Sequence, residues 1–308
     1  MQRLRWRFLL FLRRAPLIPL SVVKTIFNHQ LVLITGGSSG IGLATAKQMA
    51  ALGADVVIVS RNETRLGSAS EEIRAHCINP DQTVLWFQAD VSDYQAVSSF
   101  AARVKQVARV PDILINSAGV VRPGECVHLD PELYRWMMDV NFHGTVNVIK
   151  AFLPSMIERR SGHIVNISSI AGFLGVYGYT AYGASKFAVK GFSDSLRLEL
   201  QPYHINVSIV FPPDTETPQL EEERLYKPPL LVASEEGTSS MSADAVARAI
   251  IKGIQKKKTI ITPGFYSTLY FHLAALTGGG LIYRIMDWVM ADARRKLERN
   301  PGKYAQPH

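Results

Sequence analysis

Tyr182 and Lys186 stand four residues apart in a stretch with the pattern of a helix. This spacing places both side chains on one face of the helix, where they can reach the same substrate. A phenol has a reference pKa of about 10, and a nearby ammonium favours its ionised form. The pair therefore predicts a tyrosine whose pKa Lys186 lowers, so that it exchanges a proton with a substrate near neutral pH.

Ser169 lies thirteen residues before Tyr182, at the end of a predicted strand. The carboxyl ends of strands in an open parallel sheet face the ligand crevice. A hydroxyl group at that place can hydrogen-bond a carbonyl oxygen while negative charge builds on it. A tyrosine–lysine pair alone is most often a solvated helix face, but together with this serine it indicates carbonyl chemistry.

Residues 35–42 form a glycine-rich stretch that follows an apolar run and precedes a helical pattern. A strand, a glycine-rich turn and a helix start make a pyrophosphate site, because the first N–H groups of the helix are free and its dipole favours anions. Gly36 permits the tight turn, Gly40 lets the backbone approach the phosphates, and Gly42 lets the helix pack closely on the strand. With a second apolar run at 56–59, the stretch predicts dinucleotide binding rather than an ordinary turn.

The choice of dinucleotide can be predicted from the end of the second apolar run, which reads Ser60-Arg61 with no acid before Glu63. An NAD site places an acid there to accept from the ribose 2′-hydroxyl. Arg61 can instead pair with a 2′-phosphate through its planar fork, and Ser60 or Ser38 can add a hydroxyl. This pattern favours NADPH/NADP, the alternative being that Arg61 is only a surface residue.

Short apolar runs alternate with helical patterns from residue 31 onward, and no internal repeat is visible. The strand-like runs are 31–35, 55–60, 83–89, 112–116, 163–168, 205–211 and 258–262, and the helical stretches are 41–52, 63–76, 93–108, 131–160, 180–201 and 242–256. Such alternation predicts right-handed crossovers and a single α/β domain with a Rossmann-type doubly wound parallel sheet. Residues 212–241 are predicted to be an irregular lid, since a long loop in a compact fold is usually functional.

Charge is concentrated at the two ends of the 308-residue chain, whose formal net charge is +8. Residues 1–30 hold six basic and no acidic side chains, and residues 252–308 hold ten basic and three acidic ones. The part between them has 18 basic and 23 acidic side chains, which argues against a nucleic-acid surface on the body and for an anionic membrane near the ends. The two cysteines form no disulfide framework and have no metal-ligand company, so we expect no metal site and a reducing compartment.

The predicted organisation is a basic apolar N-terminal anchor over 1–29, a catalytic domain over 30–263 and an extension over 264–308 that is first apolar and then basic. Arg13 and Arg14 interrupt the first apolar stretch, which argues for an interfacial anchor rather than a membrane span. The alternative is a packed N-terminal arm. The uncharged stretch 260–283 is predicted to pack on the body or to dip shallowly into a bilayer, and less readily to cross it. We therefore expect a membrane-associated protein whose active site faces the cytosol, at the endoplasmic reticulum in a eukaryote or at the inner membrane in a bacterium.

The motifs together resemble the short-chain dehydrogenase/reductase family over roughly residues 30–265. The glycine-rich stretch, Asn116 to Gly119, Asn141, Ser169, Tyr182 and Lys186 all occur in the order and spacing of that family. The resemblance implies that Asn141, Ser169, Tyr182 and Lys186 are catalytic, with Asn141 holding a water that relays protons to Lys186. It also implies a cofactor site formed by Gly36, Ser38, Ser39, Gly40, Ile41, Gly42, Ser60, Arg61, Asp90, Val91, Asn116, Ala118, Gly119, Tyr182, Lys186, Pro212, Thr215 and Thr217. Ser117 and Pro213 depart from the family's usual asparagine and glycine.

The departure at Pro213 indicates a particular branch of the family. The run from Phe211 to Pro218, followed by acidic residues and Lys227-Pro228, resembles the branch of the family that reduces long-chain sphingoid ketones at a membrane. A carboxylate of the acidic stretch (Glu216, Glu221, Glu222 and Glu223) could meet the ammonium of such a substrate, although a solvated surface is the commoner role. The alternatives are a retinoid, steroid or other lipid dehydrogenase and, in a different class, a non-catalytic nucleotide-sensing scaffold. A homo-oligomer is also compatible with the sequence.

Overall fold

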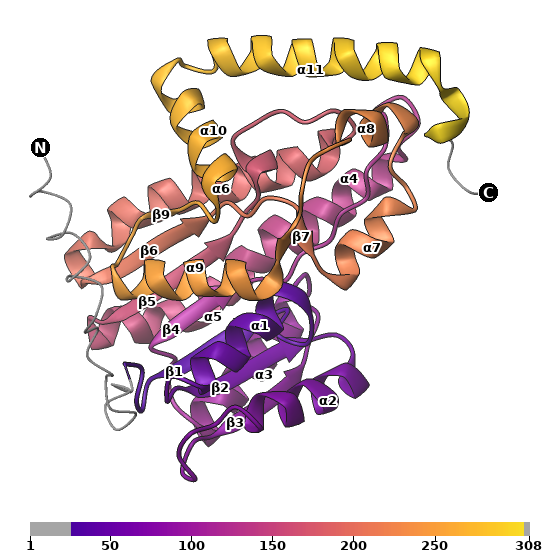
Figure 1. The fold of residues 1–308 in the computed structure, drawn as a ribbon. Helices are drawn as coiled ribbons and strands as arrows, with labels where there is room; N and C mark the ends of the chain where they lie inside the picture. Colours follow the sequence, from indigo (N-terminus) through magenta and orange to yellow (C-terminus); the bar gives the residue numbers. More distant parts are fainter. Residues whose placement is uncertain (1–25, 305–308) are drawn as a thin grey trace, which may run out of the picture.

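The computed structural model describes residues 26–304 and contains one seven-stranded sheet in which all the strands are parallel (Figure 1). Its strands are β1 (Leu31–Thr35), β2 (Asp55–Ser60), β3 (Val84–Gln88), β4 (Ile113–Asn116), β5 (Gly162–Ile167), β6 (Ile205–Val210) and β9 (Ile260–Ile261). The spatial order β3-β2-β1-β4-β5-β6-β9 reverses direction between β1 and β4. The doubly wound parallel sheet predicted from the sequence is thus confirmed, and its ligand crevice is expected at that reversal.

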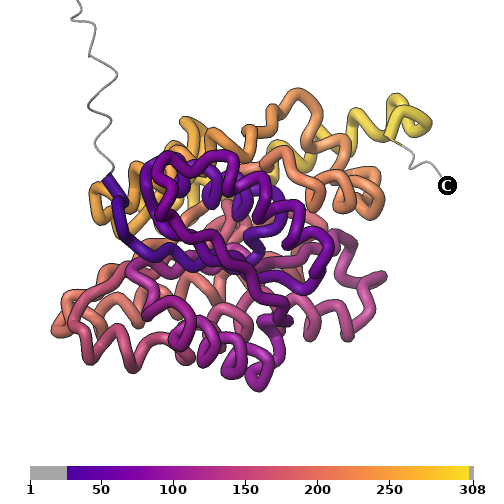
Figure 2. The backbone as a smooth tube through the Cα atoms, turned by 90° about the horizontal axis from the view of Figure 1, so that it is seen from below, coloured from indigo at the N-terminus to yellow at the C-terminus, as the bar shows by residue number. Residues whose placement is uncertain are grey.

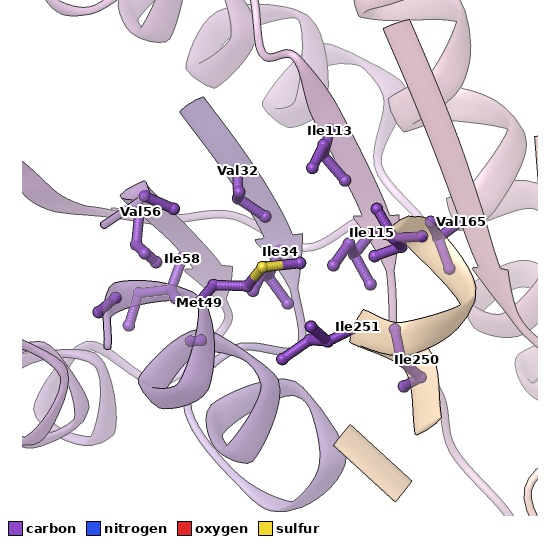
Figure 3. Close-up of a cluster of buried hydrophobic side chains, with 14 of the residues drawn as sticks. Val32, Ile34, Met49, Val56, Ile58, Ile113, Ile115, Val165, Ile250 and Ile251 are labelled. Atoms are coloured by element: carbon purple, nitrogen blue, oxygen red, sulfur yellow. The ribbon is translucent and has the colours of Figure 1, made fainter. Parts of the chain in front are cut away.

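Helices cover both faces of the sheet. One face carries α1 (Gly40–Ala50), α2 (Glu63–Arg74) and α9 (Ala243–Gln255), and the other carries α3 (Tyr94–Val107), α5 (Gly144–Arg159) and α6 (Thr180–Leu200). Figure 3 shows the first layer, where Val32 and Ile34 of β1 meet Met49 of α1 and Ile250 and Ile251 of α9. Because both faces are covered, the strands are apolar at nearly every position rather than at alternate ones.

Residues 131–160 were predicted as one helix, and this prediction is wrong in one respect. The stretch consists of α4 (Pro131–Met138), a π-helical turn at Asp139–His143, and α5. Gly144 follows the turn and packs so closely that a Cβ there would lie 2.6 Å from Cγ2 of Val91. The widened turn lies at Asn141, and such single π turns inside helices are frequent at functional sites.

Residues 212–241 are not the irregular loop predicted from the sequence. They contain α7 (Pro218–Arg224), α8 (Pro229–Ser234) and the first strand of a two-stranded parallel sheet, β7 (Thr215–Glu216) with β8 (Met241–Ser242). Both helices begin with a proline, which is well accommodated at the first helical position because its missing N–H has no partner there. The short helices were hidden in the sequence because six or seven residues hold too little periodicity to detect.

The last two α-helices of the described chain are α10 (Phe265–Leu276) and α11 (Gly280–Arg299), and a short 3-10 turn (Pro301–Lys303) follows them. In Figure 1, α10 rises from the body and α11 lies across it above α8; Figure 2 shows the end of this segment on the opposite side of the molecule from the start of β1. Apolar side chains remain exposed along both helices, at Phe265, Tyr266, Leu269, Leu276, Leu281, Tyr283 and Trp288. Packing on the body is therefore only partial.

Within residues 26–304, no helix combines the length and the apolar character that a membrane crossing requires. The interfacial anchor predicted for residues 1–29 lies almost wholly outside the described residues, which include Phe27. That side chain is buried in the core, and its N–H donates to the carbonyl of Leu52. Phe27 thus packs in the core although it precedes the first strand.

Candidate active site

Ser169, Tyr182 and Lys186 come together at the carboxyl end of β5. Ser169 follows that strand and caps a short 3-10 turn, its Oγ accepting from the N–H of Ala171 at 3.2 Å. Tyr182 lies in the first turn of α6, and its side chain hydrogen-bonds that of Ser169. One turn further on, the Lys186 ammonium lies 5.6 Å from the centre of the Tyr182 ring. A phenol, a hydroxyl and an ammonium therefore share one place, as the spacing in the sequence predicted.

Close packing fixes α6 against β5. The Nζ of Lys186 donates to the carbonyl of Ile167 at 3.0 Å, and the hydroxyl of Ser168 donates to the Lys186 carbonyl at 3.0 Å. A Cβ at Gly172 would lie 2.2 Å from Oγ of Ser168 and 2.9 Å from the Lys186 carbonyl oxygen. Only a glycine allows this approach without a shift, so residue 172 helps to set the height of the lysine above the strand.

Asn141 is buried beside this group but does not hydrogen-bond it directly. Its Oδ1 accepts from the N–H of Val120 at 2.8 Å, and its Nδ2 donates to the Val120 carbonyl and to Oγ of Ser185, each at 2.9 Å. A Cβ at Gly119 would lie 3.2 Å from Oδ1 of Asn141 and 3.3 Å from Nζ of Lys186. The two groups thus flank Gly119, and the relay through a water remains a prediction.

The electrostatics at Tyr182 differ from the expectation that Lys186 lowers its pKa. Burial raises the pKa of Tyr182, the nearby Glu223 carboxylate raises it further, and the hydrogen bond with Ser169 lowers it only in part. Burial also lowers the pKa of Lys186, to about 8. The expectation was wrong because burial and a carboxylate, which the spacing of two residues cannot show, decide the direction of the pKa shift. A raised pKa keeps the phenol protonated at neutral pH, so Tyr182 holds the proton that a reduced carbonyl oxygen would take up.

The glycine-rich stretch takes the geometry that a phosphate-binding turn needs. Gly36 has φ +67° and Gly40 has φ +53°, in the left-handed region that favours glycine. A Cβ at Gly42 would lie 2.3 Å from the carbonyl oxygen of Gly36. Ser39 caps α1 without a side-chain hydrogen bond, and no acidic residue lies in the first turn of that helix. The start of α1 therefore offers backbone N–H groups and a positive dipole end, with Ser38, Ser39 and Ile41 around it.

Residues after β4 close the same crevice. The N–H groups of Ser117 and Ala118 donate to Oγ1 of Thr35 at 3.1 and 3.2 Å, which ties the loop after β4 to the end of β1. Asn116 is buried, and its Nδ2 donates to Oδ1 of Asn166 at 2.9 Å. This bond joins β4 to β5 beside the crevice.

The predicted adenosine end lies after β2 and β3. Arg61 forms a long ion pair with Asp90, with 4.0 Å between Nη1 and Oδ2, while Oδ1 of Asp90 accepts from Ser92. Asn147 fixes the backbone of Val91, donating to its carbonyl at 3.0 Å. A cavity of about 390 Å³ lies between the glycine-rich stretch and α2, lined by Ser38, Ser39, Gly40, Leu43, Thr64, Arg65, Ser68, Ala69, Glu72 and Pro218. Sequence reasoning did not identify Arg65 as a candidate cofactor ligand.

The segment after β6 lies over the glycine-rich stretch. The carbonyl of Pro212 accepts from the N–H of Ile170, and Oγ1 of Thr215 donates to the Pro213 carbonyl at 2.8 Å. Thr217 caps α7, and a Cβ at Gly40 would lie 2.9 Å from its Cγ2. The start of α7 thus covers the place where the phosphates of a dinucleotide would lie.

The residues present fit a nicotinamide cofactor. Among the described residues, three buried side-chain polar atoms have no hydrogen-bond partner: Nε of Arg122, Oγ of Ser60 and Oδ1 of Asn116. The last two lie at strand ends on the crevice. Glycines at 36, 40, 42 and 119 leave space that a Cβ would fill or crowd. Buried polar atoms without partners are uncommon, so a polar ligand along this crevice accounts for the two at the strand ends.

The sequence did not predict the group of buried residues next to Tyr182, which comprises Tyr179, Glu223 and Lys227. The hydroxyl of Tyr179 donates to Glu223, and Lys227 forms ion pairs with Glu223 and Glu235. The ring of Tyr179 lies 5.9 Å from that of Tyr182, tilted by 57°. Glu223 and Lys227 were noticed only as members of an acidic stretch and of a Lys-Pro motif, and no local signal showed that both would be buried.

The chain is similar to a protein family, to individual proteins of known activity and to solved structures. A model of the short chain dehydrogenase family matches residues 30–227. The chain is 39% identical to the 3-ketodihydrosphingosine reductase of Bos taurus over 222 residues, covering 72% of this chain and 67% of that protein. Among solved structures, it resembles a short-chain dehydrogenase from Sphingobium yanoikuyae in complex with NADPH, with a TM-score of 0.70, 28% identity and coverage of 82% and 95%. It also resembles a short-chain dehydrogenase/reductase from Burkholderia phymatum in complex with NAD, with a TM-score of 0.68, 26% identity and coverage of 76% and 89%.

Proposed function

Since the chain belongs to the short-chain dehydrogenase family, we propose that it uses NADPH to reduce the ketone of 3-ketodihydrosphingosine to the secondary alcohol dihydrosphingosine, a step of sphingolipid biosynthesis. The observation that carries the reductase chemistry is the hydrogen-bonded Ser169–Tyr182 pair with Lys186 beneath it. Similarity to reductases of this ketone supports the substrate. A scaffold protein would not require the phenol, the hydroxyl and the ammonium to remain at one place.

The residues of the chain divide the reaction among them. A bound nicotinamide cofactor supplies the hydride for the carbonyl carbon. Ser169 and Tyr182 orient the carbonyl oxygen, and the phenol of Tyr182 donates the proton that this oxygen takes up, so that one hydride and one proton give the alcohol. The hydrogen bond from Lys186 to the carbonyl of Ile167 fixes the position of the ammonium. The ammonium keeps positive charge beside Tyr182 while the phenol gives up its proton.

The test is reduction by the purified chain, followed through NADPH oxidation, of a long-chain sphingoid ketone and of steroid and retinoid carbonyls. We expect the sphingoid ketone to give the highest kcat/KM, and this value to fall steeply as the alkyl tail is shortened, since each buried methylene contributes about 0.8 kcal/mol. Equal or higher activity on a steroid or retinoid would overturn the substrate while leaving the reductase chemistry. No activity on any of these carbonyls would favour the scaffold alternative.

NADPH, rather than NADH, is proposed from the charge at the end of β2. Arg61→Asp removes a cation that can pair with the 2′-phosphate and adds a repelling carboxylate, so we expect the preference to shift toward NADH by about 10-fold or more. The measurement is kcat/KM for both cofactors, with Arg65→Asp made separately. If Arg61→Asp leaves the ratio unchanged and Arg65→Asp reverses it, then Arg65 reads the phosphate from the cavity beside α2.

The apolar C-terminal helices suit a membrane surface, which the active site would meet from the cytosolic side. Phe265 and Trp288 are 73% and 65% exposed, and basic residues follow on α11, at Arg294, Arg295 and Arg299. In the middle of α10, Phe271 stacks on Phe211 at 5.5 Å, and Phe211 directly follows β6 and precedes Pro212 of the predicted cofactor site. This arrangement would let an alkyl tail pass from lipid to the site without crossing water.

We expect the double substitution Phe265→Glu with Trp288→Glu to lower co-flotation with anionic vesicles, because it places charge where apolar rings would meet the lipid. The control is Val127→Glu, which alters an apolar side chain that is 82% exposed elsewhere on the molecule. The comparison is made both in the full chain and in one lacking residues 1–25, so that a separate N-terminal contact does not mask the effect. Unchanged flotation in both backgrounds would contradict the role of α10 and α11.

A further inference from the structure

One carboxylate of the acidic stretch differs from the others in its place. Glu216, Glu221 and Glu222 are exposed, whereas Glu223 is only 8% exposed. Glu223 shares the inner face of α7 with the buried Leu220, three residues earlier. Carboxylates are rarely buried without a charged or hydrogen-bonding partner, so the contacts that stabilise buried Glu223 need to be identified.

The contacts of Glu223 form a buried charged cluster. Its Oε1 accepts from the hydroxyl of Tyr179 and lies 3.3 Å from Nζ of Lys227. Lys227, 3% exposed, donates to both carboxylate oxygens of Glu235 at 2.8 Å. One ammonium thus lies between two carboxylates.

This cluster acts electrostatically on the proton donor. Tyr179 caps α6 next to the catalytic turn, and its ring contacts that of Tyr182. After burial, the charged groups that raise the pKa of Tyr182 are the carboxylates of Glu223 and Asp214. A negative field opposes loss of a proton from a phenol, so with an uncharged substrate these carboxylates would slow the proton transfer. A cation bound between them and the phenol would offset that effect.

We propose that Glu223 binds the ammonium group of the substrate. This contact makes the site selective for long-chain ketones that carry an ammonium group on the carbon next to the carbonyl. This inference rests on the proposed function and identifies the group that recognises its substrate. In a 2-amino ketone the nitrogen is separated from the carbonyl carbon by one atom. When Ser169 and Tyr182 hold the carbonyl oxygen, the ammonium therefore lies within a few ångströms of the phenol, whose ring contacts Tyr179, the hydrogen-bond partner of Glu223.

A purely structural role for Glu223 makes a different prediction. If the carboxylate only fastens α7 to Tyr179 and Lys227, its loss would weaken the activity on charged and uncharged ketones alike. Recognition of the ammonium instead predicts a loss confined to the charged substrate. The ratio of kcat/KM for the two ketones separates these roles, because a general loss of folded or correctly closed enzyme cancels in it.

The experiment compares wild type and Glu223→Gln on the 2-amino ketone and on the uncharged ketone of equal chain length that lacks the amino group. Glutamine still accepts from Tyr179 but carries no charge. We expect the ratio of kcat/KM, amino ketone over uncharged ketone, to fall about 10- to 100-fold in the variant. The matched control is Glu235→Gln, which removes a carboxylate from the same lysine and should leave the ratio within a few-fold of wild type.

An unchanged ratio in Glu223→Gln, or an equal fall in Glu235→Gln, would overturn the inference. If wild type reduces neither ketone, the proposed function itself fails. Should Glu223→Gln not fold, wild type alone decides the question through inhibition of uncharged-ketone reduction by an alkylammonium and by the alcohol of equal length. Tighter inhibition by the ammonium, by about 10-fold or more, supports the inference, and equal inhibition overturns it.

Discussion

Replacing Tyr182 by phenylalanine is expected to abolish nearly all turnover while leaving the cofactor bound. The substitution removes the hydroxyl that bonds Ser169 and donates the proton, but it keeps the ring that contacts Tyr179. General acid catalysis contributes typically about 10²–10⁴-fold, so kcat should fall by at least this order. Steady-state kinetics on the preferred ketone measure the loss, and nicotinamide fluorescence measures cofactor binding.

Tyr203→Phe is the matched control for Tyr182→Phe. Tyr203 lies beyond the far end of α6 and loses the same atom away from the site. Its variant should keep the wild-type kcat. If Tyr182→Phe turned over within a few-fold of wild type, the proton would come from another group, and the assignment of Tyr182 would be wrong.

Lys186→Met should lower kcat/KM by about 10²-fold or more and should also change its pH dependence. Removing one preorganised electrostatic contact at a developing charge typically costs about 10²–10³-fold. Burial lowers the pKa of Lys186 to about 8. A lysine is charged below its pKa, so in wild type the activity that depends on the ammonium is present below about pH 8 and lost above it. The variant, which has no ammonium to lose, should show no fall at that pH.

Lys190→Met provides the comparison for this pH profile. Lys190 lies one turn further along α6, in an ion pair with Asp194 at 2.8 Å on the surface. The control should keep both the activity and the alkaline fall of wild type. A Lys186→Met enzyme that retains the same fall near pH 8 would show that another group causes it.

Local patterns in the sequence predicted the sheet and most of the site. The strand-like runs 31–35 and 55–60 match β1 and β2 residue for residue, because a strand buried on both faces needs continuous apolar residues. The four-residue spacing of Tyr182 and Lys186 was equally informative, since a helix of any sequence places such positions on one face. Ser169 could be added because the ends of parallel strands meet at one edge of the sheet.

Elements whose form depends on distant neighbours could not be predicted in this way. The π turn at Asp139–His143 precedes Gly144, which packs closely on Val91, more than fifty residues earlier in the chain. The short α7 and α8 gain most of their stability from the surfaces that they cover, since six or seven residues alone do not sustain a helix.

The sequence by itself determined which groups can do chemistry here and the fold that gathers them, since both follow from residue type and short-range periodicity. Only the tertiary structure decided in what environment those groups act. Tyr179 and Glu223 are 44 residues apart in the chain and hydrogen-bonded in the fold. Burial and the Glu223 carboxylate raise the pKa of Tyr182, where its spacing to Lys186 predicted a fall. A pKa depends on burial and on every charge within several ångströms, and these are set by contacts between segments that the sequence leaves far apart.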